Sequence, residues 1–127
     1  MQRLIPLILI FMLGGTTYAL GDDNLLQTAN QIYHLSEEMV FHGSEGHAHE
    51  IIDNGEKMII EIDRLTRDMK NMKLLHRKKL QEEIRATRKI TESAIKFGKQ
   101  GNLLAALASA KSASFQAKKV RQALRLL

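Results

Sequence analysis

The same turn pattern occurs twice in this chain, at Phe41-His42-Gly43-Ser44-Glu45-Gly46-His47 and again at Lys96-Phe97-Gly98-Lys99-Gln100-Gly101-Asn102. The second copy follows the first by 55 residues, and in each copy two residues separate the glycines. Glycine adopts the positive φ angles at which many helices end, so each copy predicts a turn between two helices. The repeat therefore predicts that the domain consists of two helical hairpins.

Apolar and small residues recur every three or four positions on both sides of these turns, which is the spacing of one helical face. We expect a first helix from Asn24 to about Phe41, a second from His47, a third ending before Gly98 and a fourth after Asn102. Asp23 or Asn24 and Asn102 are the expected N-caps. The buried faces are expected at Leu25, Ala29, Ile32, Ser36 and Met39; Ile51, Gly55, Met58, Ile62, Leu65, Met69 and Met72; Leu80, Ile84, Thr87, Ile90, Ala94 and Phe97; and Leu103, Ala106, Ala110, Ala113, Ala117, Val120, Leu124 and Leu127.

The predicted fold is all-α, an up-down antiparallel four-helix bundle made of two helical hairpins and preceded by a signal peptide. The boundary between the second and third helices is less marked, because no glycine or proline lies between Asp68 and Leu75. These two helices are either continuous or joined by a tight turn at Asn71. The sequence also leaves open whether the chain dimerises through the alanine stripe of its last helix.

Residues 1–19 have the features of a secretory signal peptide: Arg3, an apolar run from Leu4 to Leu13, and small residues at the −3 and −1 positions of Thr17-Tyr18-Ala19. The apolar run is shorter than the about 20 residues that span a bilayer. We expect cleavage after Ala19, export to the periplasm or the medium, and one domain over residues 20–127. An uncleaved membrane anchor is the alternative.

Charge is divided unevenly along the chain. Residues 20–63 carry a net charge of −9 and residues 64–127 carry +13, which with Arg3 gives the total of +5. Either the two halves complement each other electrostatically, or the acidic half, which holds four of the five histidines, attracts cations.

Several classes of function are not expected from this composition. The chain has no cysteine, which excludes thiolate metal sites, thiol nucleophiles and Cys-x-x-Cys-His haem attachment. It also has no glycine-rich phosphate loop and no nucleophile elbow, so we do not expect an enzyme. Nucleic acid is an unlikely partner for an exported chain with so few aromatic residues.

The histidines gather around the first turn. His34, Glu38 and His42 follow one another at intervals of four, along one face of the expected helix. The turn folds the end of this helix onto the start of the next, where His47, His49 and Glu50 lie. The proposed ligands of one metal ion are His34, His42, His47 and His49 with Glu38, Glu45 or Glu50.

Mixed imidazole and carboxylate ligands suit Cu(II), Ni(II) or Zn(II), and the Irving–Williams order places Cu(II) first. Met39 is a softer candidate ligand for Cu(I), but its place on the apolar face favours core packing. The alternative is that the histidines form a solvated polar corner without a metal. His76 lies apart from them in a basic stretch and is expected to face solvent.

The motif His42-Gly43-Ser44-Glu45-Gly46-His47 resembles the small metal-binding protein (SmbP-like) family of short, exported, cysteine-free helical bundles. The resemblance implies a four-helix fold and binding of copper and other divalent metals in the periplasm through histidines on the helices. In the second copy Phe97 and Asn102 stand where this motif has histidines. The resemblance therefore implies a single site in the first hairpin.

A second class of function rests on the basic half of the chain. The bases between Lys70 and Arg125 can form a face that binds an acidic protein partner or an anionic membrane surface. The bland alternative is a solvated charged face. Metal titration at the histidines and salt-sensitive binding at the lysines distinguish the two functions.

Overall fold

The computed structural model describes the backbone of residues 4–127 and the side chains of residues 24–127. Across these residues the chain forms four α-helices with no strand: α1 (Leu4–Ser44), α2 (Ala48–Asp68), α3 (Leu74–Lys99) and α4 (Leu103–Arg125). The short 3-10 helix η1 (Met69–Asn71) separates α2 from α3. The predicted all-helical architecture of four packed helices is confirmed.

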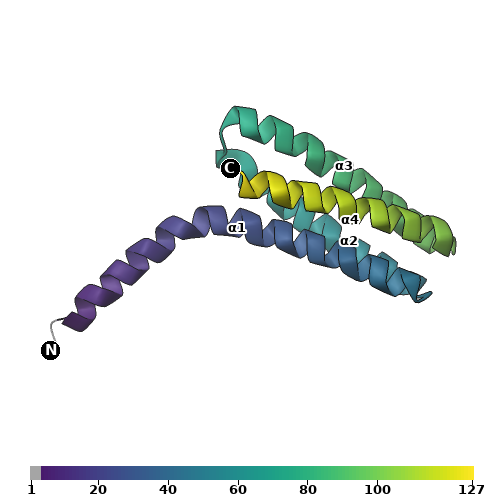
Figure 1. The fold of residues 1–127 in the computed structure, drawn as a ribbon, viewed down its shortest axis with the longest axis horizontal. Coiled ribbons are helices and arrows are strands. Elements are labelled where there is room, and N and C mark those ends of the chain that lie inside the picture. The colour runs from purple at the N-terminus through teal and green to yellow at the C-terminus, as the bar shows by residue number, and fades with distance from the viewer. Residues whose placement is uncertain (1–3) are drawn as a thin grey trace.

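Figure 1 shows how the helices are arranged. Consecutive helices run in opposite directions, so that the α1–α2 and α3–α4 turns lie at one end of the bundle and η1 lies at the other. The purple, N-terminal part of α1 extends beyond the other helices, from the end where η1 and the C-terminus lie. The two turns are therefore neighbours in space.

The predicted start of the first helix at Asn24 is wrong, because α1 passes through this position without a break. Thr28 Oγ1 donates a hydrogen bond to the carbonyl of Asn24 at 2.9 Å, as it does inside a continuous helix. Asparagine favours a cap, but a cap is needed only where the preceding residues leave the helix. The predicted signal segment, residues 1–19, lies outside the residues whose side chains are described. Among the described side chains, no helix is long and apolar enough to cross a membrane.

The core follows the predicted apolar faces closely. Every residue expected on these faces is buried or half-buried except Leu127, which is 57% exposed. Met58, Ile62 and Leu65 from α2 are fully enclosed, and they belong to the same core cluster as the buried alanines of α4. Replacing a side chain as large as Met58 by alanine costs about 2–5 kcal/mol, since it leaves a cavity. The core thus fixes the helices that carry the histidines.

Burial repeats with the same offset as the two turns. Ile32, Met39 and Ile51 are buried, and so are the residues 55 positions later: Thr87, Ala94 and Ala106. The hydroxyl group of Thr87 is satisfied inside this core, because it donates to the carbonyl of Glu83 at 2.8 Å. The internal repeat therefore covers whole hairpins rather than the turns alone.

The boundary between the second and third helices is a tight turn and not a continuous helix. α2 ends at Asp68, η1 follows, and Met72 is extended with φ −75° and ψ 155°. Fully buried Met69 anchors this turn. The turn contains no glycine and its methionine is buried like those of the helix before it, so the sequence does not show where α2 ends.

Candidate metal centre

The first turn closes through two backbone hydrogen bonds. The amide of His47 donates to the carbonyl of His42 at 2.9 Å, and the amide of Gly46 donates to the carbonyl of Gly43 at 3.1 Å. Gly46 has φ 88°, in the left-handed region. This combination is the Schellman motif, in which the left-handed residue ends the helix and the next residue bonds five positions back.

The second turn has the same backbone. Asn102 donates to Phe97 at 2.9 Å, Gly101 donates to Gly98 at 3.0 Å, and Gly101 has φ 74°. Asn102 also caps α4 as predicted, because its Oδ1 accepts a hydrogen bond from the amide of Ala105 at 3.2 Å.

The first glycine of each turn has a role different from the predicted one. Gly43 and Gly98 do not adopt a positive φ. A Cβ on Gly43 would lie 2.8 Å from Ile51 Cδ1 and 3.0 Å from Leu107 Cδ1, and one on Gly98 would lie 2.9 Å from Ile52 Cγ1. These glycines allow close contact between helices, and the second glycine of each turn supplies the left-handed angle.

The Schellman motif brings the side chains of His42 and His47 together. These are the two residues joined by its hydrogen bond across five positions, and side chains so joined commonly touch. The two ring centroids are 5.9 Å apart and the ring planes are tilted by 32°. Phe41 packs edge-on against His42, with ring centroids 5.3 Å apart. His47 is the residue before α2, but its side chain makes no capping hydrogen bond. The ring nitrogens of His47 are therefore not engaged in capping α2.

Glu45 completes a group of three, which we call the His42–Glu45–His47 group. One ligand atom from each residue lies within 4.8 Å of the other two, and no other such group occurs among the described side chains. His47 Nδ1 is 3.7 Å from Glu45 Oε2. His42 is 27% exposed, whereas His47 and Glu45 are about half exposed. An ion at this position would thus be open to solvent, with water available as a further ligand.

Glu38 supports His42 from the preceding turn of α1. Its Oε2 lies 3.3 Å from His42 Nε2, and its Oε1 lies 3.8 Å from His34 Nε2. His42 Nδ1 is buried and has no hydrogen-bond partner. With its proton on Nε2, facing the carboxylate, His42 has a free lone pair on Nδ1. A carboxylate that orients a histidine in this way is the usual partner of a metal-bound imidazole.

The other predicted ligands lie outside this group. His49 is 82% exposed, and its Nε2 pairs with Asp53 Oδ2 at 3.1 Å. Glu50, in the first turn of α2, accepts a hydrogen bond from the Asn54 side chain at its backbone carbonyl. Met39 is fully buried in the core, in agreement with the preferred interpretation of this residue.

The helix ends give an ion little net attraction at this turn. The carboxyl end of α1 attracts a cation and the amino end of α2 repels it, and both effects fall off within one turn. The carboxylates Glu38 and Glu45 must supply the negative charge. The nearby base Lys99 is paired, with Nζ 3.4 Å from Glu56 Oε1.

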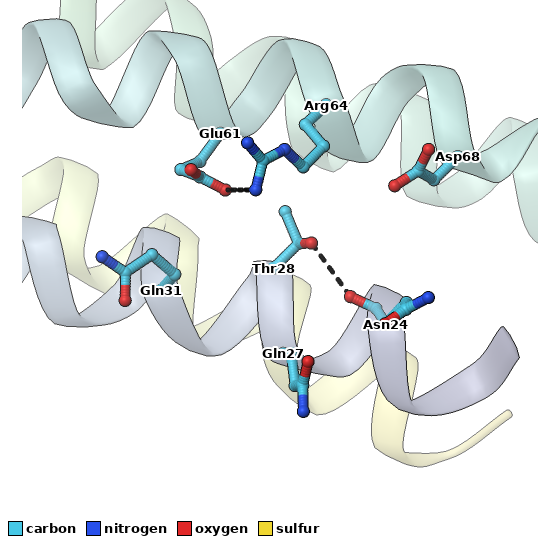
Figure 2. Close-up of a pocket in the computed structure, with 7 residues that line it drawn as sticks. All are labelled: Asn24, Gln27, Thr28, Gln31, Glu61, Arg64 and Asp68. Carbon is cyan, nitrogen blue, oxygen red and sulfur yellow. Dashed lines mark hydrogen bonds and ion pairs between the residues drawn. The ribbon is translucent and has the colours of Figure 1, made fainter. Parts of the chain in front are cut away.

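A polar groove between α1 and α2 is less suited to an ion (Figure 2). Its lining residues are Asn24, Gln27, Thr28, Gln31, Glu61, Arg64 and Asp68. The Glu61 carboxylate points to Arg64, with Oε2 and Nη1 3.5 Å apart, and Asp68 lies apart from them. Because a base pairs with one of its two carboxylates, this groove has no converging set of ligands.

Compared with known proteins, the chain matches no family model and no curated protein. The resemblance to the SmbP-like family stays a prediction, which rests on the motif at residues 42–47.

Proposed function

We propose that this protein is an exported, non-catalytic protein that binds one divalent metal ion, with Cu(II) preferred, at the first hairpin turn. The observation that carries the proposal is the convergence of ligand atoms from His42, Glu45 and His47 within 4.8 Å of one another. Two imidazoles and a carboxylate form a ligand set that suits Cu(II), Ni(II) and Zn(II), and Cu(II) binds such sets most tightly.

Glu38 has one of two roles in this proposal. If the ion binds His42 Nε2, the Glu38 carboxylate at 3.3 Å is a fourth protein ligand. If the ion binds the unpartnered Nδ1, Glu38 holds the ring in the required tautomer. His34 and His49 are more exposed, and both already face carboxylates. Because neither has a ligand atom in the His42–Glu45–His47 group, we assign them to the surroundings of the site rather than to its ligands.

Calorimetric titration of the protein with Cu(II), Ni(II) and Zn(II) tests the proposal. We expect one Cu(II) ion per chain, with weaker binding of the other two ions. The double variant His42→Ala/His47→Ala should lose this binding. His76→Ala is the control, because His76 is an exposed histidine in the first turn of α3, next to η1 and away from the first hairpin turn. An unchanged titration in the double variant, or equal loss in the control, would contradict the assignment.

Export is tested separately. Mass spectrometry of the protein recovered from the cell envelope should give an N-terminus at Leu20, which follows the Thr17-Tyr18-Ala19 cleavage site. A chain that keeps Met1 would instead be anchored in the membrane by its apolar run.

A further inference from the structure

Positive charge gathers at the end of the bundle opposite the histidines. Residues 69–81 hold five bases and no acid. We call these bases, Lys70, Lys73, Arg77, Lys78 and Lys79, together with Leu74 and Leu75, the basic end. Within residues 24–127 none of the five bases forms an ion pair; of the bases in this range only Arg64, Arg88 and Lys99 do, so the basic end is distinguished by its clustering rather than by the lack of pairs. Among the described side chains, Lys70, Lys73, Lys78 and Lys79 are therefore not used to hold the bundle together, whereas the Arg77 guanidinium donates a hydrogen bond to the carbonyl of Lys70 at 3.1 Å and stabilises the turn after η1.

Apolar side chains are exposed among these bases. Leu74 is 56% exposed and Leu75 is 79% exposed. Leu126, which is 87% exposed, lines a small cleft beside His76 and Lys79, so the last turn of α4 adds to the same surface. Exposed leucines that lie together usually mark a contact surface. Apolar residues surrounded by bases fit the boundary between anionic headgroups and acyl chains.

The position of the basic end also points to a membrane. Asn24 and Leu25 of α1 line one cleft together with Lys70 and Asn71, so the chain that precedes Asn24 leaves the bundle beside the basic end. Figure 1 shows that α1 departs from the bundle at this end. On the proposed export, on which this step rests, the preceding chain with its apolar run from Leu4 to Leu13 enters the membrane before cleavage after Ala19. The basic end is thus the part of the bundle nearest to that membrane.

We propose that the basic end docks onto an anionic phospholipid surface, with Leu74 and Leu75 inserted at the headgroup boundary and the bases bound to lipid phosphates. An acidic polypeptide would match the bases alone, whereas a lipid surface matches the bases and the leucines. In this orientation the His42–Glu45–His47 group, at the other end of the bundle, faces away from the lipid.

The chain has no tryptophan, so a single introduced tryptophan reports only its own surroundings. Leu75→Trp places this reporter in the basic end, and Leu104→Trp places it at a site 82% exposed near the hairpin turns. Both variants, in the exported form that begins at Leu20 and so lacks the apolar run from Leu4 to Leu13, are mixed with phosphatidylglycerol vesicles and, separately, with phosphatidylcholine vesicles. We expect the emission of the Leu75→Trp variant to shift to shorter wavelength with the anionic vesicles alone, and the Leu104→Trp variant to show no shift.

Charge variants in the Leu75→Trp background test the bases. Each base near an anionic surface is worth about fivefold in partitioning, so Lys73→Gln/Lys78→Gln/Lys79→Gln should weaken the docked state roughly 100-fold and abolish the shift. Lys89→Gln/Lys96→Gln/Lys111→Gln removes the same charge from exposed positions elsewhere and should retain it.

Three results would overturn the proposal: no shift of Leu75→Trp on anionic vesicles, an equal shift on phosphatidylcholine, or an equal shift of Leu104→Trp. Added poly-glutamate tests whether the basic end binds an acidic polypeptide instead. Binding of poly-glutamate without any vesicle-induced shift would assign the basic end to an acidic polypeptide and would also overturn docking on lipid.

Discussion

In each hairpin turn one Schellman hydrogen bond joins residues five positions apart. At the first turn these residues are His42 and His47, and at the second they are Phe97 and Asn102. The bond is 2.9 Å long in both turns, and the left-handed glycine occupies the same place. The first pair brings together two imidazoles, one of them more than half exposed. In the second pair, Phe97 packs against the core and Asn102 caps α4. The backbone therefore determines the turn, and the side chains it brings together are free to differ.

The difference extends beyond the turns. Glu38 and Glu45 correspond, 55 positions later, to Ser93 and Gln100, which carry no charge. Ser93 instead donates a hydrogen bond to the carbonyl of Lys89. The two hairpins thus share the positions that are buried, and they differ in the charged residues around the turn. A metal site is expected only where the shared turn coincides with imidazoles and carboxylates.

The largest effect should come from giving the first turn the side chains of the second. We expect His42→Phe/His47→Asn to weaken Cu(II) binding by more than about 100-fold, because even a supporting partner of a ligand is worth 10- to 100-fold. The fold should persist, since both side chains already occupy this backbone in the second turn. Calorimetry and circular dichroism measure the two outcomes.

The reciprocal change sharpens the same comparison. Phe97→His/Gln100→Glu/Asn102→His should install a second metal-binding turn and raise the stoichiometry to two ions per chain. Failure to gain a second ion would show that the first turn contributes more than the three ligands, with Glu38 the leading candidate.

Glu38 has the next largest expected effect. Glu38→Gln should weaken Cu(II) binding about 10- to 100-fold, whether the carboxylate is a ligand or orients His42. Glu37→Gln is the matched control, because Glu37 is an exposed neighbour and its substitution removes the same charge. Equal losses in the two variants would mean that only the general negative charge matters.

Metal binding should also weaken in acid, since protons compete for the same imidazole nitrogens.

The shared backbone predicts equal costs for the two left-handed glycines. Gly46→Ala and Gly101→Ala should each lower the free energy of unfolding by roughly 1–2 kcal/mol, because an L side chain is strained at positive φ. A Cβ at either position meets no atom within 4 Å, so no other contact enters the measurement. Chemical denaturation of the two variants gives the values. Clearly unequal costs would break the equivalence of the turns.

The smallest effect distinguishes the two residues that precede the helices. Asn102→Ala should cost about 1 kcal/mol of stability, since it removes the cap of α4. His47→Ala should cost less in the metal-free protein, because His47 makes no capping hydrogen bond. Thermal unfolding of both variants without metal measures the difference. A larger loss for His47→Ala would mean that its ring stabilises the turn itself.

The sequence predicted the parts of the structure that depend on residues close together in the chain. The apolar spacing located the buried faces, and the paired glycines located both turns. The start of α1 was missed because Asn24 has the side chain of a cap but lies inside a continuing helix. The break before α3 was left undecided because Met69 and Met72 continue the apolar spacing of α2 beyond its end at Asp68, so this spacing does not mark where the helix stops.

The candidate site was predictable for a similar reason. Four residues separate His42 from His47, and the motif itself specifies the turn that joins them. His49 was also expected to converge, but each helical residue turns the side chain by about 100°, so a position two residues after His47 faces elsewhere. The role of Glu38 depends on which nitrogen of His42 carries the proton, and spacing alone does not determine this.

The shortness of the loop that joins His42 to His47 has a consequence for folding. The contact order of the site is very low, so the turn and its ligands can assemble early, before the four helices have packed. Copper should then bind partly folded chains as well as native ones. An ion with affinity for both states raises the melting temperature less than its native affinity alone would imply. Metal capture would therefore depend little on how completely the rest of the bundle has folded.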